Sequence, residues 1–192
     1  MKRVQKFQDE MTAFFRKLYV DEQKRLVFGD GDAHARILMV GEAPGEQEAL
    51  QGRPFVGKAG KNLDEFLALS RLDRRALYIT NTVKFRPTKI SGAGRIVNRP
   101  PTQEEIKLNV PWLLREIELV DPEMIVTLGN VPLKALLGRE MTIGACHGQW
   151  MKWEGRSVYP LYHPASVLYN PALREVYRAD VARLGEEVRT CD

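Results

Sequence analysis

Short apolar runs alternate along the chain with longer segments in which apolar residues recur every three or four positions. The runs have the length of buried strands, and they predict strands at residues 36–40, 76–81, 123–129 and 157–164. The periodic segments predict helices at residues 1–20, 57–72, 102–120, 130–138 and 171–188. Thr102 and Glu105 have the spacing of a capping box, which marks the start of the third helix.

This alternation of strands and helices predicts the fold class. We expect an α/β protein, a three-layer αβα sandwich with a central, mainly parallel four-stranded sheet. Residues 82–101 are polar and have no regular period, which is typical of a loop. The sequence contains no internal repeat, no low-complexity tract and no composition change, so we expect one domain over residues 1–192.

The composition is that of a globular protein, with 44% hydrophobic and 28% charged residues among 192. The apolar runs are too short to span a membrane, and the first residues, MKRVQKFQDEM, are charged throughout. We therefore expect a cytoplasmic protein with no membrane partner. The net charge of +4 is compatible with a nucleic-acid partner. Nothing indicates an obligate subunit, so we expect a monomer.

Cysteines and histidines argue against a metal site. The two cysteines, Cys146 and Cys191, are far apart, and the three histidines are scattered without metal-ligand spacing. A disulfide framework or a cysteine-built metal site is therefore not expected, and we predict no bound metal.

Polar residues follow three of the predicted strands, at the edge where ligands collect in parallel α/β folds. Glu42 comes after the first strand, Asn81 ends the second and His163 ends the fourth. A carboxylate at the end of a buried strand is costly unless it has a role. An amide both donates and accepts, which suits the edge of a pyrimidine. The alternatives are a solvated turn glutamate, a turn asparagine and a structural histidine.

The segment GRPFVGKA, residues 52–59, nearly matches a phosphate-binding P-loop. Ala59 stands where that motif needs a hydroxyl, and no strand precedes Gly52, so the motif is rejected. Phe55 in this segment lies between Pro54 and Gly57. It is either a core aromatic or a platform on which a flat ring stacks.

Four blocks together carry a family resemblance: GEAPG, QGRPFVGKAG, YITNTVKFRP and YHPAS. Their order and spacing resemble the uracil-DNA glycosylase superfamily, most closely its family 4 type, over roughly residues 26–180. The resemblance implies hydrolysis of the N-glycosidic bond of uracil in DNA after the base is flipped out of the duplex, leaving an abasic site.

The resemblance also implies roles for individual residues. Asn81 would read the uracil edge, Phe55 would stack on its ring, and the backbone at Gly41 and Ala43 would add hydrogen bonds. Two catalytic roles are implied. His163 would donate a hydrogen bond to uracil O2 as negative charge develops, and Glu42 would face the cationic sugar or orient water. No cofactor is required.

Contacts to DNA, single- or double-stranded, are implied for two regions. The basic residues near the pocket would contact phosphates, and these are Lys58, Lys61, Lys84, Arg86, Lys89, Arg95 and Arg99. The alternative for each is a solvated surface charge. The segment after His163 resembles a loop that wedges into the duplex, with Ser166, Leu168 and Tyr169 as its contacts.

The sequence departs from the family pattern in its cluster positions. Family 4 enzymes carry four cysteines that bind a [4Fe–4S] cluster, but here Phe85 and Asn109 take two of these positions and residues 11–20 contain no cysteine. We therefore predict that no cluster binds and that Phe85 packs on the first helix in its place.

The acids and the basic loop also depart from the pattern. Ala43 and Ala49 stand where relatives have carboxylates, and residues 82–101 contain no histidine for a covalent DNA adduct. Two alternatives therefore stay open: a weakly active or non-catalytic DNA-binding member that recognises uracil or abasic sites, and a glycosylase for another deaminated base. A small-molecule hydrolase is disfavoured because the G-x-S-x-G elbow is missing.

Overall fold

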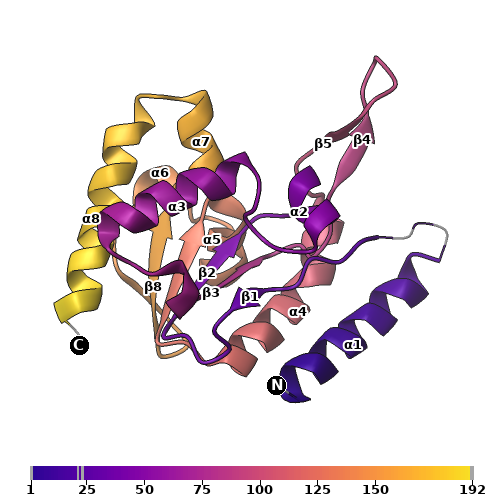
Figure 1. Cartoon of the computed structure of the whole chain (residues 1–192), viewed down its shortest axis with the longest axis horizontal. Helices are drawn as coiled ribbons and strands as arrows, with labels where there is room; N and C mark the ends of the chain where they lie inside the picture. The colour runs from indigo at the N-terminus through magenta and orange to yellow at the C-terminus, as the bar shows by residue number, and fades with distance from the viewer. Residues whose placement is uncertain (1, 21, 23, 191–192) are drawn as a thin grey trace.

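The computed structural model describes residues 2–20, 22 and 24–190, and of Leu168 and Thr190 only the backbone. A six-stranded sheet with the order β1-β3-β2-β6-β8-β7 forms its centre (Figure 1). The strands are β1 (Asp30–Gly31), β2 (Ile37–Gly41), β3 (Leu77–Asn81), β6 (Met124–Leu128), β7 (Met151–Trp153) and β8 (Arg156–Leu161).

The four predicted strands are confirmed as the inner part of this sheet. Strands β3, β2, β6 and β8 are parallel to one another, and every residue of β2, β3 and β6 is buried, as expected when helices cover both faces. The predicted count of four was wrong. Short strands β1 and β7 add an antiparallel edge on each side, so the sheet is mixed.

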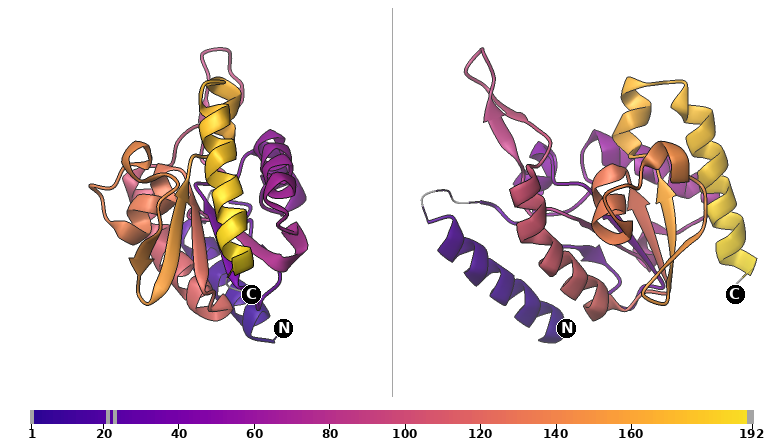
Figure 2. Two further views of the ribbon diagram at one scale, coloured as in Figure 1. Left: turned by 90° about the vertical axis from the view of Figure 1, so that its left-hand side faces the viewer. Right: turned by 180° about the vertical axis from the view of Figure 1, so that it is seen from behind.

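Helices cover both faces of the sheet, which confirms the α/β class (Figures 1 and 2). On one face α3 and α8 bury Phe66, Tyr177 and Leu184, and on the other α4 and α5 bury Leu113 and Leu136. The helices are α1 (Lys2–Leu18), α2 (Glu46–Gln51), α3 (Lys58–Ser70), η1 (Arg74–Ala76), α4 (Gln103–Val120), α5 (Asn130–Leu137), α6 (Ile143–Cys146), α7 (Pro164–Tyr169) and α8 (Leu173–Thr190). None of these helices is long and apolar enough to cross a membrane.

A separate apolar cluster joins α1 to α4. Phe15 of α1 meets Phe85 with ring centroids 5.8 Å apart, and Tyr19 meets the same ring at 5.4 Å. Trp112 of α4 and Met11 complete the cluster. The predicted packing of Phe85 on the first helix is therefore confirmed.

Two hairpins were not predicted. Glu154 and Gly155, both at positive φ, make a tight turn between β7 and β8, of the kind that suits the twist of paired strands. Residues 82–101, expected to be irregular, contain the antiparallel strands β4 (Thr88–Ile90) and β5 (Ile96–Asn98).

The predicted capping box at the start of α4 is confirmed, since the Thr102 hydroxyl accepts from Glu105 N and the Glu105 carboxylate accepts from Thr102 N.

Candidate active site

Three strand ends meet at one edge of the sheet and bring the predicted residues together. Gly41 and Asn81, the last residues of β2 and β3, are directly paired. His163 follows β8 and is the N-cap of α7. A cavity of about 440 Å³ opens here, and Ala43, Phe55, Asn81 and His163 are among the residues that line it.

Gly41 lies against both the Asn81 amide and the Phe55 ring. A Cβ at this position would lie 2.4 Å from Asn81 Oδ1 and 2.5 Å from Phe55 Cζ, so only glycine fits. The Phe55 ring also lies 5.8 Å from the His163 ring, centroid to centroid. The amide, the phenyl ring and the imidazole therefore face one space of about the size of a nucleobase site.

Phe55 is held in a strained backbone conformation, with φ at 52°. Arg74 donates hydrogen bonds to the carbonyl oxygens of Pro54 and Phe55 at 3.0 and 3.1 Å. Gly60 allows α3 to pass close behind, because a Cβ there would lie 1.9 Å from Phe55 O. These contacts hold the backbone of Phe55 in this conformation.

Glu48 is a site residue to which the sequence analysis gave no role. Its buried carboxylate accepts from Val56 N at 3.1 Å, from Gly57 N at 2.8 Å and from Gly45 N at 3.1 Å. It thereby ties the turn after β2 to the loop that carries Phe55. Its position three residues after Gly45 is the capping-box spacing, which was a detectable signal.

The hydrogen bonding of His163 defines its tautomer. Its Nδ1 accepts from the backbone N–H of Ala165 at 3.2 Å, so in the neutral ring the proton is on Nε2. Burial lowers the pKa of His163 to about 4, although Glu48 opposes that shift. Above that pH the ring is a neutral hydrogen-bond donor through Nε2.

Glu42 lies directly after Gly41 and is half-buried. Desolvation raises the pKa of its carboxyl group above the usual 4.5. Its backbone carbonyl accepts from Val83 N at 2.9 Å, which extends the β2–β3 pairing past the strand end. Glu42 is not among the residues that line the cavity, so its role stays a prediction.

The residues predicted to contact DNA differ in whether they line the cavity, are partly buried or pair with other side chains. Lys58 and Tyr169 line the cavity, and Tyr169 is 87% exposed at its mouth. Ser166 is partly buried in α7, and its N–H donates to His163 O at 2.8 Å. The side chain of Leu168 lies outside the described part of the chain. Arg86 contacts Asn98 at 2.6 Å and Glu46 at 3.5 Å, so it belongs partly to the protein surface network.

Lys84 was wrongly predicted to contact DNA, because it is fully buried. Its ammonium group forms an ion pair with Glu116 and donates to Thr80 Oγ1 at 2.8 Å and to Asn81 O at 2.7 Å. A lysine in a polar stretch is normally solvated, but here its partner comes from α4, distant in sequence. The structure therefore assigns Lys84 to the support of Asn81.

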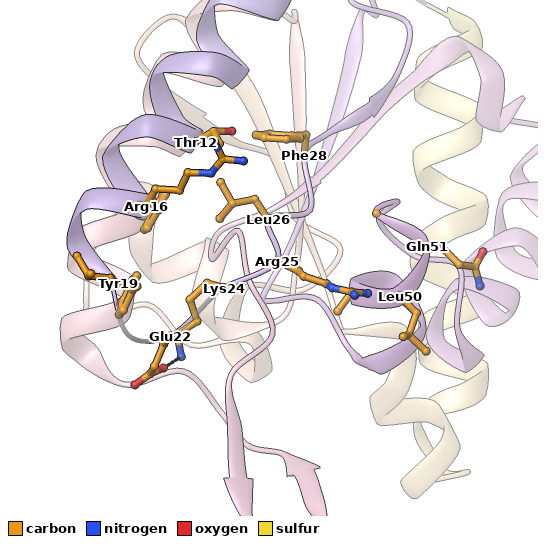
Figure 3. A pocket seen from close by; sticks show the side chains of 14 residues that line it. Thr12, Arg16, Tyr19, Glu22, Lys24, Arg25, Leu26, Phe28, Leu50 and Gln51 are labelled. Atoms are coloured by element: carbon orange, nitrogen blue, oxygen red, sulfur yellow. Dashed lines mark ion pairs between the residues drawn. The ribbon is translucent and has the colours of Figure 1, made fainter.

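A larger cavity, of about 760 Å³, lies elsewhere, between α1, residues 22 and 24–28, and α2 (Figure 3). Arg16, Arg25 and Leu50 are among its lining residues, as are Lys24 and Glu22, which form an ion pair. It contains none of the predicted site residues. Volume alone therefore does not locate the chemistry in this protein.

The residues at the family's cluster positions do not fit an iron–sulfur cluster. Phe85 is packed among aromatic rings, and Asn109 uses its amide to accept from Lys84 N and to donate to Glu105 O. The one described cysteine, Cys146, is in α6, outside this region. Among the described residues no group of three histidine, cysteine or acidic side chains is placed to hold a metal.

Comparisons with known proteins identify the family of the sequence. Residues 28–183 match the family model of the Uracil DNA glycosylase superfamily. The chain is 39% identical over 176 residues to a Type-4 uracil-DNA glycosylase of Saccharolobus solfataricus, covering 85% of this chain and 76% of that protein. It is 41% identical over 166 residues to a Type-4 uracil-DNA glycosylase of Archaeoglobus fulgidus, covering 82% and 79%.

A solved structure shows the same fold. The crystal structure of Pedobacter heparinus SMUG2 is similar with a TM-score of 0.54, 15% identity, and coverage of 94% of this chain and 82% of that one. At this identity the likeness concerns the fold alone, and the family assignment depends on the matched sequence. The chain belongs to the uracil DNA glycosylase superfamily.

Proposed function

We propose that this chain hydrolyses the N-glycosidic bond of uracil in DNA and leaves an abasic site. The observation that carries the proposal is the convergence of the Asn81 amide, the Phe55 ring and the neutral His163 ring on one cavity. Since a base in a duplex cannot reach this cavity, the nucleotide must be flipped into it.

The Asn81 amide selects uracil. Asn81 is 2% exposed and rests against Gly41, so its amide is held in place before the base arrives. Its Nδ2 donates to uracil O4 and its Oδ1 accepts from N3–H, whereas cytosine presents the opposite pattern at these atoms. Phe55 stacks on the ring and adds affinity without distinguishing the bases.

Bond cleavage separates two charges. The C1′–N1 bond breaks with its electron pair going to uracil, so the sugar becomes oxocarbenium-like and the base anionic. Nε2–H of His163 donates to O2, where the negative charge develops. Glu42 supplies a carboxylate beside the cationic sugar, and water adds to C1′ and loses its proton to that carboxylate.

The function is tested with uracil-containing oligonucleotides, single- and double-stranded. Incubation followed by alkaline cleavage reports the abasic product on a gel, and release of free uracil confirms which bond broke. We expect product from both substrates. Tight binding of uracil DNA without any release would instead support a non-catalytic binding protein. The alanines at positions 43 and 49, where relatives have acids, favour that second candidate.

The raised pKa of Glu42 predicts an acid limb in the pH profile. Because the carboxylate form is the active one, log(kcat/KM) should fall as pH drops through a pKa above 4.5, before His163 protonates near 4. In Glu42→Gln the residual activity, about 10²–10⁴-fold lower, should lose this limb and decline only near pH 4. Excision assays in buffers from pH 4 to 8 measure the pH profiles of the wild type and of Glu42→Gln.

The raised pKa of Glu42 also predicts that its ionised form, which serves catalysis, makes the folded protein less stable. A carboxyl group whose folded pKa is raised makes the folded state less stable as pH rises through that pKa. Glu42→Gln should therefore increase the unfolding midpoint in denaturant at pH 7 and leave it unchanged below pH 4.5. A variant that loses stability at pH 7 would contradict the assigned burial of this group.

The amide is tested by Asn81→Asp. The carboxylate cannot donate to uracil O4, so that buried oxygen is left without a hydrogen bond. This costs about 1–3 kcal/mol, and kcat/KM for uracil should fall by about 5- to 150-fold. Asn130→Asp is the matched control, because Asn130 is exposed, does not line this cavity, and its Oδ1 accepts from Ile143 N, a contact that aspartate retains. If Asn81→Asp behaves like the control, Asn81 does not read the base.

A further inference from the structure

The hairpin of β4 and β5 projects from the body of the protein at the end where α7 also lies (Figures 1 and 2). Its turn is closed by Gly94 N donating to Ser91 O at 2.9 Å, with Gly94 at positive φ. Asn98, at the base of the hairpin, lines the candidate active-site cavity. The hairpin is therefore positioned beside the mouth through which a flipped nucleotide would enter.

The tip of the hairpin exposes two isoleucines. Ile90 and Ile96 are directly opposite each other in the strand pair and are 76% and 65% exposed. Each strand is three residues long, and the pair contacts no buried core. An apolar pair on a projecting ribbon is unfavourable in water and is typical of a surface that contacts a partner.

The charges around this pair have one sign. Residues 82–103 contain five basic residues and no acidic one. Three of the five are occupied, because Lys84 pairs with Glu116, Arg99 with Glu105, and Arg86 with Glu46. Lys89 and Arg95 remain, next to the isoleucines, and form no ion pair within the described part of the chain. The tip therefore has two free cations around an apolar pair.

We propose that the β4–β5 hairpin docks on duplex DNA beside the flipped nucleotide, with Lys89 and Arg95 on phosphates and Ile90 and Ile96 in the groove. The proposal rests on the proposed function. A two-stranded ribbon fits a DNA groove, and branched apolar side chains contact groove surfaces. Single-strand binding would need aromatic rings for base stacking, and residues 88–98 contain none.

Two double variants test the two parts of the surface. Lys89→Gln/Arg95→Gln removes the free cations, and Ile90→Thr/Ile96→Thr removes apolar groups while keeping residues that favour strands. The charge-matched control is Arg3→Gln/Lys6→Gln on exposed positions of α1. Binding is measured by fluorescence anisotropy with a duplex that carries a non-cleavable abasic analogue and with the same single strand.

The charge variant should bind the duplex about tenfold more weakly. The slope of its log affinity against log salt should fall by about 1.8, since each phosphate contact contributes about 0.9. The isoleucine variant should weaken duplex binding with an unchanged salt slope. Single-strand binding and the thermal midpoint should stay as in the wild type, and the control should change neither.

Unchanged duplex affinity in both variants would overturn the proposal, as would equal losses on duplex and single strand. The anisotropy measurement needs no excision, so it is independent of catalysis. Failure of the proposed function would show separately, as wild-type protein that releases no uracil from a single strand.

Discussion

Replacing His163 with asparagine is expected to lower the single-turnover rate of uracil excision by about 10²- to 10³-fold, the usual cost of losing one donor to a developing anion. Asparagine is chosen because its Oδ1 can still accept from Ala165 N and cap α7, as Nδ1 of His163 does. Its amide is too short to replace Nε2. The loss should therefore appear in the chemical step and not in the folding of α7.

The ionisation of His163 separates this mechanism from one with a charged donor. Because its pKa is about 4, the ring stays neutral through the physiological range, and its NMR signals should not titrate between pH 5 and 8. The control for the excision assay of His163→Asn is His34→Ala, which changes an exposed histidine and should leave the excision rate unchanged. A His163 ring that titrates near pH 6.5, or an asparagine variant with normal single-turnover rates, would remove this residue from catalysis.

The elements that were predicted correctly are those whose apolar residues follow a regular pattern within the element itself. The inner strands are continuous apolar runs because both faces are buried, and the helices between them are long enough to show their period. Glu42, Asn81 and His163 were found because parallel strands end at the same edge. Asn81 and His163 line one cavity with Phe55, whereas Glu42 follows the same edge and is not among the lining residues.

The parts that were missed depend on tertiary contacts. Strands β1 and β7 have two and three residues, too few to show alternation, and they exist only by pairing with β3 and β8. The β4–β5 hairpin exposes its apolar residues, so it lacks the buried face that a strand pattern reports. Glu48 received no role from the sequence, because its partners are backbone N–H groups up to nine residues away.

The clearest error concerns Lys84, and its burial changes how the site is understood. Glu116 accepts from Tyr78 Oη at 2.9 Å and from Thr80 Oγ1 at 2.8 Å in addition to pairing with Lys84. Lys84 then donates to Asn81 O, so a buried polar network runs from α4 to Asn81, the residue proposed to read uracil. Burial lowers the pKa of Lys84, and the Glu116 carboxylate opposes that shift.

Lys84→Met should therefore lower the free energy of unfolding by about 3–5 kcal/mol, because it leaves the Glu116 carboxylate buried without a counterion. Lys84→Met/Glu116→Gln should recover much of the loss. The Gln Oε1 can accept from Tyr78 as before, and its Nε2 can donate to the Thr80 hydroxyl. Lys107→Met, at an exposed position of α4, is the matched control and should change stability little. Urea unfolding of the four proteins measures these differences.

DNA binding and excision kinetics, measured under conditions in which the variants are folded, then distinguish two roles of Lys84: holding Asn81 in place and contacting a DNA phosphate. A lysine that contacted a phosphate would reduce the salt slope of DNA binding by about 0.9 when removed. A lysine that only holds Asn81 should leave the slope unchanged and lower kcat/KM for uracil in Lys84→Met and in the double variant, because both lose the hydrogen bond to Asn81 O. A reduced salt slope, or full activity in the double variant, would contradict the role of Lys84 in positioning Asn81.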